Sequence, residues 1–180
     1  MLLWQHLSKA SKRAVFSAQL AARRAGQAEV CPEHLAFAIM SDPLGEVAAT
    51  FDDLGVDRDE CCEAMSRRFA ASRGRTPLAP GFSAPVRRTL TVAYFIAKTE
   101  HRGVVRPHHL FLAMIVEPTN VAKALASQGV EVKDLQAALM KIDTETDAIN
   151  PNAQFVATSF WVAFGICALA VFTAWWIGAR

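Results

Sequence analysis

A run of residues that begins with proline occurs twice in this chain, 75 positions apart. The two runs are Pro32 to Met40 and Pro107 to Ile115. In each run the proline favours the first position of a helix, and apolar residues follow at the i, i+3 and i+4 spacing of one helix face. Each run therefore predicts a buried helix, and the repetition indicates an internal duplication.

The correspondence extends on both sides of these runs, so that two repeats cover about residues 8–71 and 83–142. The same offset pairs Arg13 with Arg88, Ala18 with Ala93, Ala22 with Ala97, Val30 with Val105 and Pro43 with Pro118, and a one-residue shift pairs Gly55-Val56 with Gly129-Val130. A repeat of about 65 residues has too small a core to be comfortably stable alone. We therefore expect both repeats to share one domain over residues 1–147.

Each repeat also contains the residues that begin and end helices. Ser8 or Ser11 can cap a first helix that Gly26 stops. Gly55 can supply the left-handed residue that ends a third helix, and Asp57 can cap a fourth. The second repeat follows the same order, and no stretch alternates for long enough to indicate a sheet. The sequence predicts an all-α domain built from a duplicated four-helix repeat.

The C-terminal part of the chain differs in composition. Hydrophobic residues make up 52% of the sequence, and beyond Asp147 the only charged residue is Arg180. Residues 148–154 are predicted to be a linker because they contain Asn150-Pro151-Asn152. The uncharged segment from Phe155 to Ile177 would be about 34 Å long as a helix, enough to cross a hydrocarbon core of about 30 Å. We predict a transmembrane helix that contacts membrane lipid.

The N-terminus predicts the orientation of that helix. Met1 to Trp4 is too short for the apolar core of a signal peptide, so export is not indicated. Moving three C-terminal residues across the membrane is cheaper than moving the charged repeats. The expected topology is a single-pass tail anchor in the bacterial inner membrane, with the repeat domain in the cytoplasm.

Charge and motif content exclude several classes of protein. Without Arg180 the chain has 18 basic and 17 acidic residues, which argues against a nucleic-acid partner. Neither a phosphate-binding G-x-x-x-x-G-K-[ST] loop nor a G-x-S-x-G motif is present, and the four cysteines form no C-x-x-C pair. We expect no catalytic residues, no cofactor and no enzymatic activity.

Three histidines of the second repeat raise the question of a metal. His101, His108 and His109 do not have the i, i+4 spacing of a helical ligand pair, and no neighbouring cysteine or carboxylate pair completes a tetrahedral set. The sequence therefore predicts no metal site. His34 and His109 each precede a buried leucine and are interpreted as structural histidines at the edge of the core.

The repeat resembles the Clp repeat domain, the N-terminal domain of ClpA/ClpC-type unfoldases. The first copy carries the motifs of that family in Arg23-Arg24-Ala25-Gly26, Val30, Glu33-His34-Leu35 and Leu54-Gly55-Val56-Asp57. The second copy keeps His109-Leu110 and Gly129-Val130, with His101, His108 and Gln128 at positions where the family has glycine, glutamate and leucine.

This resemblance implies an eight-helix, pseudo-twofold module that binds adaptors and substrates. Together with the predicted anchor, it implies a membrane-anchored, non-enzymatic protein-binding module that recruits protein substrates or adaptors for a Clp-type protease, with Clp protease components as partners. The alternative is a membrane scaffold or signalling subunit that retains the fold without Clp partners.

The resemblance also implies one ligand-binding residue. In some family members the glutamate of Glu-His-Leu receives phosphoarginine, because a carboxylate pairs with guanidinium while helix N–H groups favour phosphate. Glu33 is the matching position, and the alternative is that Glu33 only stabilises its own helix N-terminus. His108, at the second copy's equivalent position, cannot supply a carboxylate.

Overall fold

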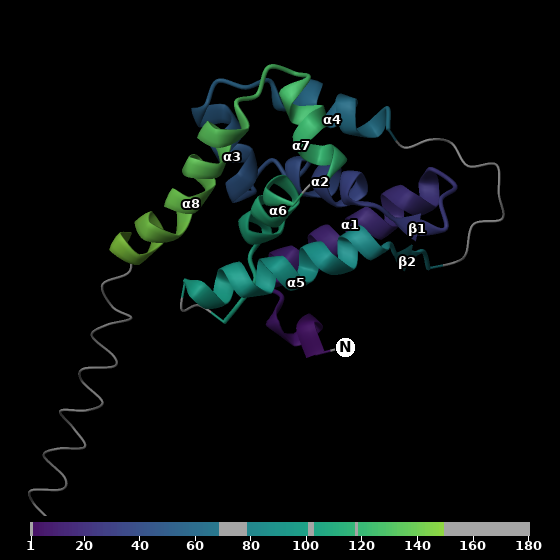
Figure 1. The fold of residues 1–180 in the computed structure, drawn as a ribbon, viewed down its shortest axis with the longest axis horizontal. Helices are drawn as coiled ribbons and strands as arrows, with labels where there is room; N and C mark the ends of the chain where they lie inside the picture. The colour runs from purple at the N-terminus through teal and green to yellow at the C-terminus, as the bar shows by residue number, and fades with distance from the viewer. Residues whose placement is uncertain (1, 69–78, 101–102, 118, 150–180) are drawn as a thin grey trace, which may run out of the picture. The chain divides into compact units, whose positions relative to one another are not determined.

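The computed structural model describes residues 2–68, 79–100, 103–117 and 119–149, and these residues are mostly helical (Figure 1). Residues 1–142 form one compact unit, and residues 143–180 are a separate unit. The described ranges contain the eight predicted α-helices: α1 (Lys9–Arg24), α2 (Pro32–Met40), α3 (Glu46–Asp53), α4 (Arg58–Ser66), α5 (Ala84–Thr99), α6 (Pro107–Val116), α7 (Asn120–Ala126) and α8 (Val132–Ile149). A short 3-10 helix, η1 (Leu2–His6), precedes α1. Helix α8 extends into the predicted linker at residues 148–154.

The predicted helix boundaries are found at the expected residues. The Ser8 side chain accepts a hydrogen bond from the backbone N–H of Ser11 at 3.0 Å and caps α1. Gly26 and Gly55 adopt the left-handed backbone with φ of 73° and 65°, and Asp57 caps α4 through two backbone N–H groups. These signals act locally, which is why the sequence predicts them well.

Two short strands, β1 (Glu29–Val30) and β2 (Gly81–Phe82), depart from the all-α prediction. They pair in parallel, with Val30 opposite Phe82. An isolated parallel bridge joins Leu7 to Val105. Because Phe82 and Val105 lie 75 positions after Leu7 and Val30, the two pairings are copies of one another.

Each of these pairings joins one repeat to the other. The segment before the first helix of a repeat pairs with the segment before the second helix of the other repeat. The backbone hydrogen bonds are Val105 N–H to His6 O (2.7 Å), Ser8 N–H to Val105 O (2.9 Å), Gly81 N–H to Ala28 O (3.1 Å) and Ser83 N–H to Val30 O (3.1 Å). Strands of two residues are too short to produce an alternating sequence pattern, so the exchange could not be read from sequence.

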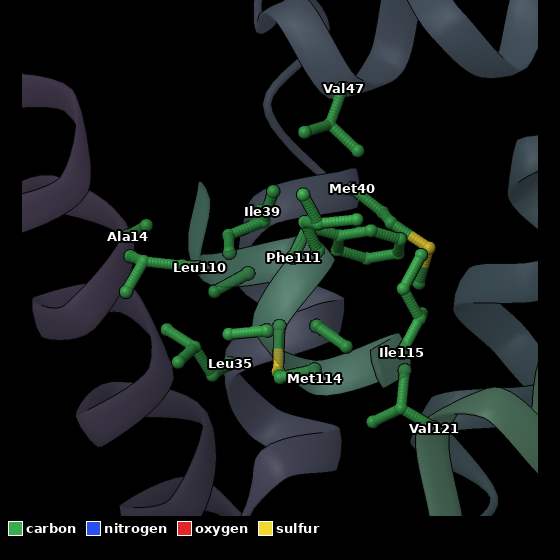
Figure 2. Packing of buried hydrophobic residues seen from close by; sticks show 14 of the residues in the cluster. Ala14, Leu35, Ile39, Met40, Val47, Leu110, Phe111, Met114, Ile115 and Val121 are labelled. Atoms are coloured by element: carbon green, nitrogen blue, oxygen red, sulfur yellow. The ribbon is translucent and has the colours of Figure 1, made fainter. Parts of the chain in front are cut away.

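The core is formed around α2 and α6, the helices of the two proline runs. Helix α1 packs against α2, and α5 packs in the same way against α6. Figure 2 shows side chains of α2 and α6 gathered together, with Val47 of α3 and Val121 of α7 at the margin of the cluster. Leu35 and Leu110 are at most 1% exposed, as predicted. The packing crosses between repeats, because α3 contacts α6 and α7 contacts α2.

The predicted membrane segment, Phe155 to Ile177, lies outside the described residues. Within residues 2–68, 79–100, 103–117 and 119–149, no helix combines the length and the apolar character needed to cross a bilayer.

Candidate functional site

The duplicated histidines stabilise the N-termini of α2 and α6. His34 and His109 are 1% and 0% exposed. Nδ1 of His34 accepts a hydrogen bond from the backbone N–H of Cys31 at 3.0 Å, and Nδ1 of His109 accepts one from the N–H of Arg106 at 2.9 Å. Each histidine is the third residue of its helix and satisfies the N–H of the residue before the proline. This geometry confirms that the two histidines are structural.

Burial is the main cause that lowers the pKa of His34, and the charge of Glu33 opposes this effect only in part. A neutral ring is the form that can accept a hydrogen bond at Nδ1. The lowered pKa therefore favours the neutral ring that the helix cap requires.

Glu33 lies in the first turn of α2, where its side chain is half-buried. None of the described residues donates a hydrogen bond to its carboxylate or forms an ion pair with it. Burial raises the pKa of the neighbouring Cys31 thiol, and the charges of Glu33 and Glu29 raise it further. Two carboxylates at this helix start attract a guanidinium cation but oppose a phosphate.

At the equivalent end of α6, a carboxylate from the first repeat contacts the helix N-terminus. Glu46 of α3 accepts hydrogen bonds from the backbone N–H of His108 at 3.1 Å and from the guanidinium of Arg106 at 2.5 Å. Its Oε1 also lies 2.6 Å from Nδ1 of His108. The carboxylate missing from the second Glu-His-Leu motif is thus supplied by Glu46 of the first repeat.

The electrostatics of Glu46 follow from these contacts. Its side chain is 16% exposed, and burial alone would raise its pKa. The hydrogen bonds and charge of His108, with the charge of Arg106, outweigh burial and lower the pKa. No motif links positions 46 and 108, because they meet only through the packing of α3 on α6.

Glu100, His108 and His109 form a cluster in which one ligand atom from each lies within 4.8 Å of the others. Nε2 of His109 is 2.6 Å from Oε2 of Glu100, while its Nδ1 accepts the Arg106 N–H. The neutral ring must therefore carry its proton on Nε2, and a metal bound there would require an imidazolate. The cluster fits a hydrogen-bonded network better than a metal site, and His101 lies outside the described residues.

The described cysteines lack the features of reactive thiols. Cys31, Cys61 and Cys62 are free, and burial is the main cause that raises the pKa of each. The pKa of Cys61 rises to about 11. Because the thiolate is the nucleophilic form, none of these three side chains is activated.

A cleft of about 1060 Å³ runs along α1. Its other wall is formed by the loop after α2, the start of α3 and residues 104–107. Leu20, Leu44 and Val104 line it and are 43%, 96% and 46% exposed. The cleft could not be predicted from the sequence, because segments far apart in the chain form it and a single exposed leucine gives no signal.

Comparison with known protein sequences finds a family match in the second half of the chain. The family model of the Clp repeat (R) N-terminal domain matches residues 81–159, which include the second copy. The chaperone protein ClpB of Mycobacterium leprae is 27% identical over 146 residues, which cover 79% of this chain and 17% of ClpB. The chain therefore spans about a sixth of that relative.

Solved structures agree with the sequence comparison. The N-domain of ClpV from Vibrio cholerae matches with a TM-score of 0.66 and 20% identity, over 77% of this chain and 88% of that domain. A complex of the ClpV N-domain with a VipB peptide matches with a TM-score of 0.63 and 22% identity, over 78% of this chain and 88% of that one. The chain therefore has the fold of a Clp N-terminal domain, and a Clp repeat is recognised in its second half.

Proposed function

We propose that this protein is a binding module that captures a peptide segment of a partner protein in the cleft along α1. The observation that supports the proposal is the exposure of Leu20, Leu44 and Val104 on the walls of one cleft. Apolar side chains that converge in a concave site gain free energy when a ligand removes them from water. The ClpV N-domain, which shares the fold, binds a VipB peptide.

A selection experiment tests this proposal without assuming the partner. A displayed library of random 16-residue peptides is selected against the intact chain, and recovered peptides are measured by fluorescence anisotropy. We expect Leu44→Ser and Leu20→Ser each to weaken binding about tenfold, the effect of losing one buried apolar anchor.

Val116 is the matched control, because it is 54% exposed but does not line the cleft. Val116→Ser should bind the recovered peptides as the wild type does. If no recovered peptide loses affinity in the two cleft variants, the cleft is not the binding site.

The cellular role that we propose is recruitment of protein substrates or adaptors at the bacterial inner membrane, for a Clp-type protease. The predicted lipid-spanning segment from Phe155 to Ile177 would hold the repeats at the cytoplasmic face.

Affinity purification from solubilised membranes, with the wild type and Leu44→Ser compared side by side, tests which partner proteins bind. Clp components or adaptors should be enriched only with the wild type, and their absence from both samples would favour a scaffold or signalling subunit.

Protease treatment of sealed inner-membrane vesicles tests the anchor and its orientation. The repeat domain should be digested when the cytoplasmic face is outside and protected when the periplasmic face is outside. Release of the intact protein by alkaline carbonate would contradict the predicted anchor.

A further inference from the structure

The cleft has a defined length because it follows one face of α1. Its lining begins at Lys9 and continues through Ala14 and Ser17 to Arg24. These fifteen steps of helix correspond to about 22 Å. Small side chains occupy the middle of this wall, where Ser17 is exposed and Ala14 is buried.

Exposed cations stand at both ends of the same wall. Lys9 and Arg13 lie near the start of α1 and Arg24 is its last residue, and all three side chains are exposed. Lys9 and Arg24 form no ion pair with any residue that the structure describes. Arg13 is 3.9 Å from Asp42, but these side chains are 75% and 45% exposed, so this pair is weak.

The carboxylates of the cleft do not balance these charges. Asp42 and Glu46 are the acidic lining residues. Glu46 is already engaged by Arg106 and His108. The exposed part of the cleft therefore has an excess of positive charge, separated by apolar and small side chains.

The second repeat provides an internal comparison. At the 75-residue offset, Ala84 and Thr99 of α5 correspond to Lys9 and Arg24 of α1. Arg88 corresponds to Arg13 and is paired with Glu117 at 3.7 Å. The cations at the two ends are thus specific to the helix that lines the cleft and are not required by the repeat fold.

From this charge pattern we infer that the cleft selects a peptide with an apolar centre and carboxylates toward both ends. The inference rests on the proposed function and names its ligand class. The apolar centre covers Leu20 and Leu44, and the terminal carboxylates pair with Lys9 at one end and Arg24 at the other. Such rim pairs contribute modestly to affinity but discriminate against a ligand of the wrong charge.

Three synthetic peptides of 16 residues test the inference against the intact chain. They share a central Leu/Ala-rich stretch and carry two glutamates, two glutamines or two lysines at each end. In anisotropy titrations at low salt, the glutamate peptide should bind about three- to tenfold more tightly than the glutamine peptide, the effect of two exposed ion pairs. Raising the salt should shrink this difference, because exposed pairs are screened.

A charge reversal makes the test specific to this site. In the double variant Lys9→Glu, Arg24→Glu the lysine peptide should bind more tightly than the glutamate peptide. Arg23→Glu is the matched control, since Arg23 is an exposed cation of the same helix that does not line the cleft. It should keep the wild-type order of the three peptides.

The outcomes separate this inference from the proposed function. Equal affinity of the glutamate and glutamine peptides, with both weakened by Leu44→Ser, would overturn the inference and leave peptide binding in the cleft intact. Loss of the preference in Arg23→Glu as well would also overturn it, because a general charge effect would then explain the result. Failure of all three peptides to bind overturns the inference, and the library selection decides separately whether the cleft binds peptides.

Discussion

His34 and His109 have the same local role in the two proline runs: each accepts the backbone N–H that precedes the proline. Proline has no N–H to donate, and the preceding residue, Cys31 or Arg106, is left with an N–H that the helix cannot satisfy. The ring of the third helical residue accepts it in both copies. A glutamate or glutamine usually has this role at a helix start, so the histidine pair is a buried version of the same device.

Replacing His34 by glutamine should reduce the pH dependence of stability. The folded state holds the pKa of His34 below its ordinary value of 6.5. Protons then bind the unfolded chain first, so this contribution is complete above pH 6.5 and decreases as the pH falls through the lowered pKa. Thermal melts at pH 8 and pH 5.5 should show a smaller loss of stability for His34→Gln than for the wild type. Equal losses would show that His34 does not control this pH range.

Glu33 carries the phosphoarginine prediction. Glu33→Ala should abolish or strongly weaken binding of free phosphoarginine, measured by calorimetric titration, because the carboxylate is the expected partner of the guanidinium. Glu63, an exposed glutamate of α4, is the control, and Glu63→Ala should bind as the wild type. Since Glu29 adds a second negative charge nearby, arginine without phosphate is a required comparison. No binding of phosphoarginine to the wild type would end the idea.

At the scale of elements, the contact of α3 with the start of α6 is a largely buried polar link between the repeats. Glu46→Ala leaves the Arg106 and His108 side chains without their shared carboxylate. Breaking a largely buried pair in this way costs about 3 kcal/mol of unfolding free energy. Urea denaturation should show this loss, whereas Glu63→Ala should cost less than about 1 kcal/mol. A Glu46→Ala protein as stable as the wild type would mean that the contacts of Glu46 with Arg106 and His108 add nothing to the free energy of unfolding.

The exchanged parallel pairings predict that the two repeats unfold together. Leu35→Asp and Leu110→Asp place a carboxylate in the shared core and cost several kcal/mol, against a total stability of about 5 to 15 kcal/mol. Each variant should therefore lose the helical circular dichroism of both repeats, not of one. Lys123→Ala should have little effect. Two resolved transitions in calorimetry of the wild type would contradict this cooperativity.

The elements differ in how far the sequence could predict them. The helices and their ends were predictable because Ser8, Gly26, Gly55 and Asp57 act on backbone groups within a few residues. The parallel pairings were not, since two-residue strands carry no periodicity. The role of Glu46 and the cleft depend on how α3 and α1 lie against distant segments, which a single sequence does not encode in any local pattern.

For the whole molecule, the near-balance of charge conceals an uneven distribution. Helix α1 contains five basic and no acidic residues, whereas α4 and its cap Asp57 contain four acidic residues and Arg58. The overall balance of charge is the basis for predicting no polyanion partner such as nucleic acid. The net charge gives no information on whether the cleft prefers an acidic or a basic peptide, because that preference depends on where the cations of α1 lie.

The difference between the two repeats predicts the stoichiometry of binding. Since Lys9 and Arg24 have no basic equivalents on α5, one cleft-directed peptide should bind per chain. Calorimetric titration with the glutamate-ended peptide should give a single class of sites with a ratio near one. A ratio near two would mean that the α5 face binds as well.

The exchanged pairings also have a consequence for how the two halves can change. Each repeat holds the leading segment of the other, which is the arrangement of a symmetric dimer whose identical subunits swap arms. In such a dimer every surface occurs twice, and any substitution alters both copies. When the halves are joined in one polypeptide, each can accept substitutions independently. Lys9 and Arg24 can therefore flank the cleft on α1 while Ala84 and Thr99 occupy the equivalent positions on α5. Covalent fusion thus keeps the mutual support of a dimer and releases one half to specialise.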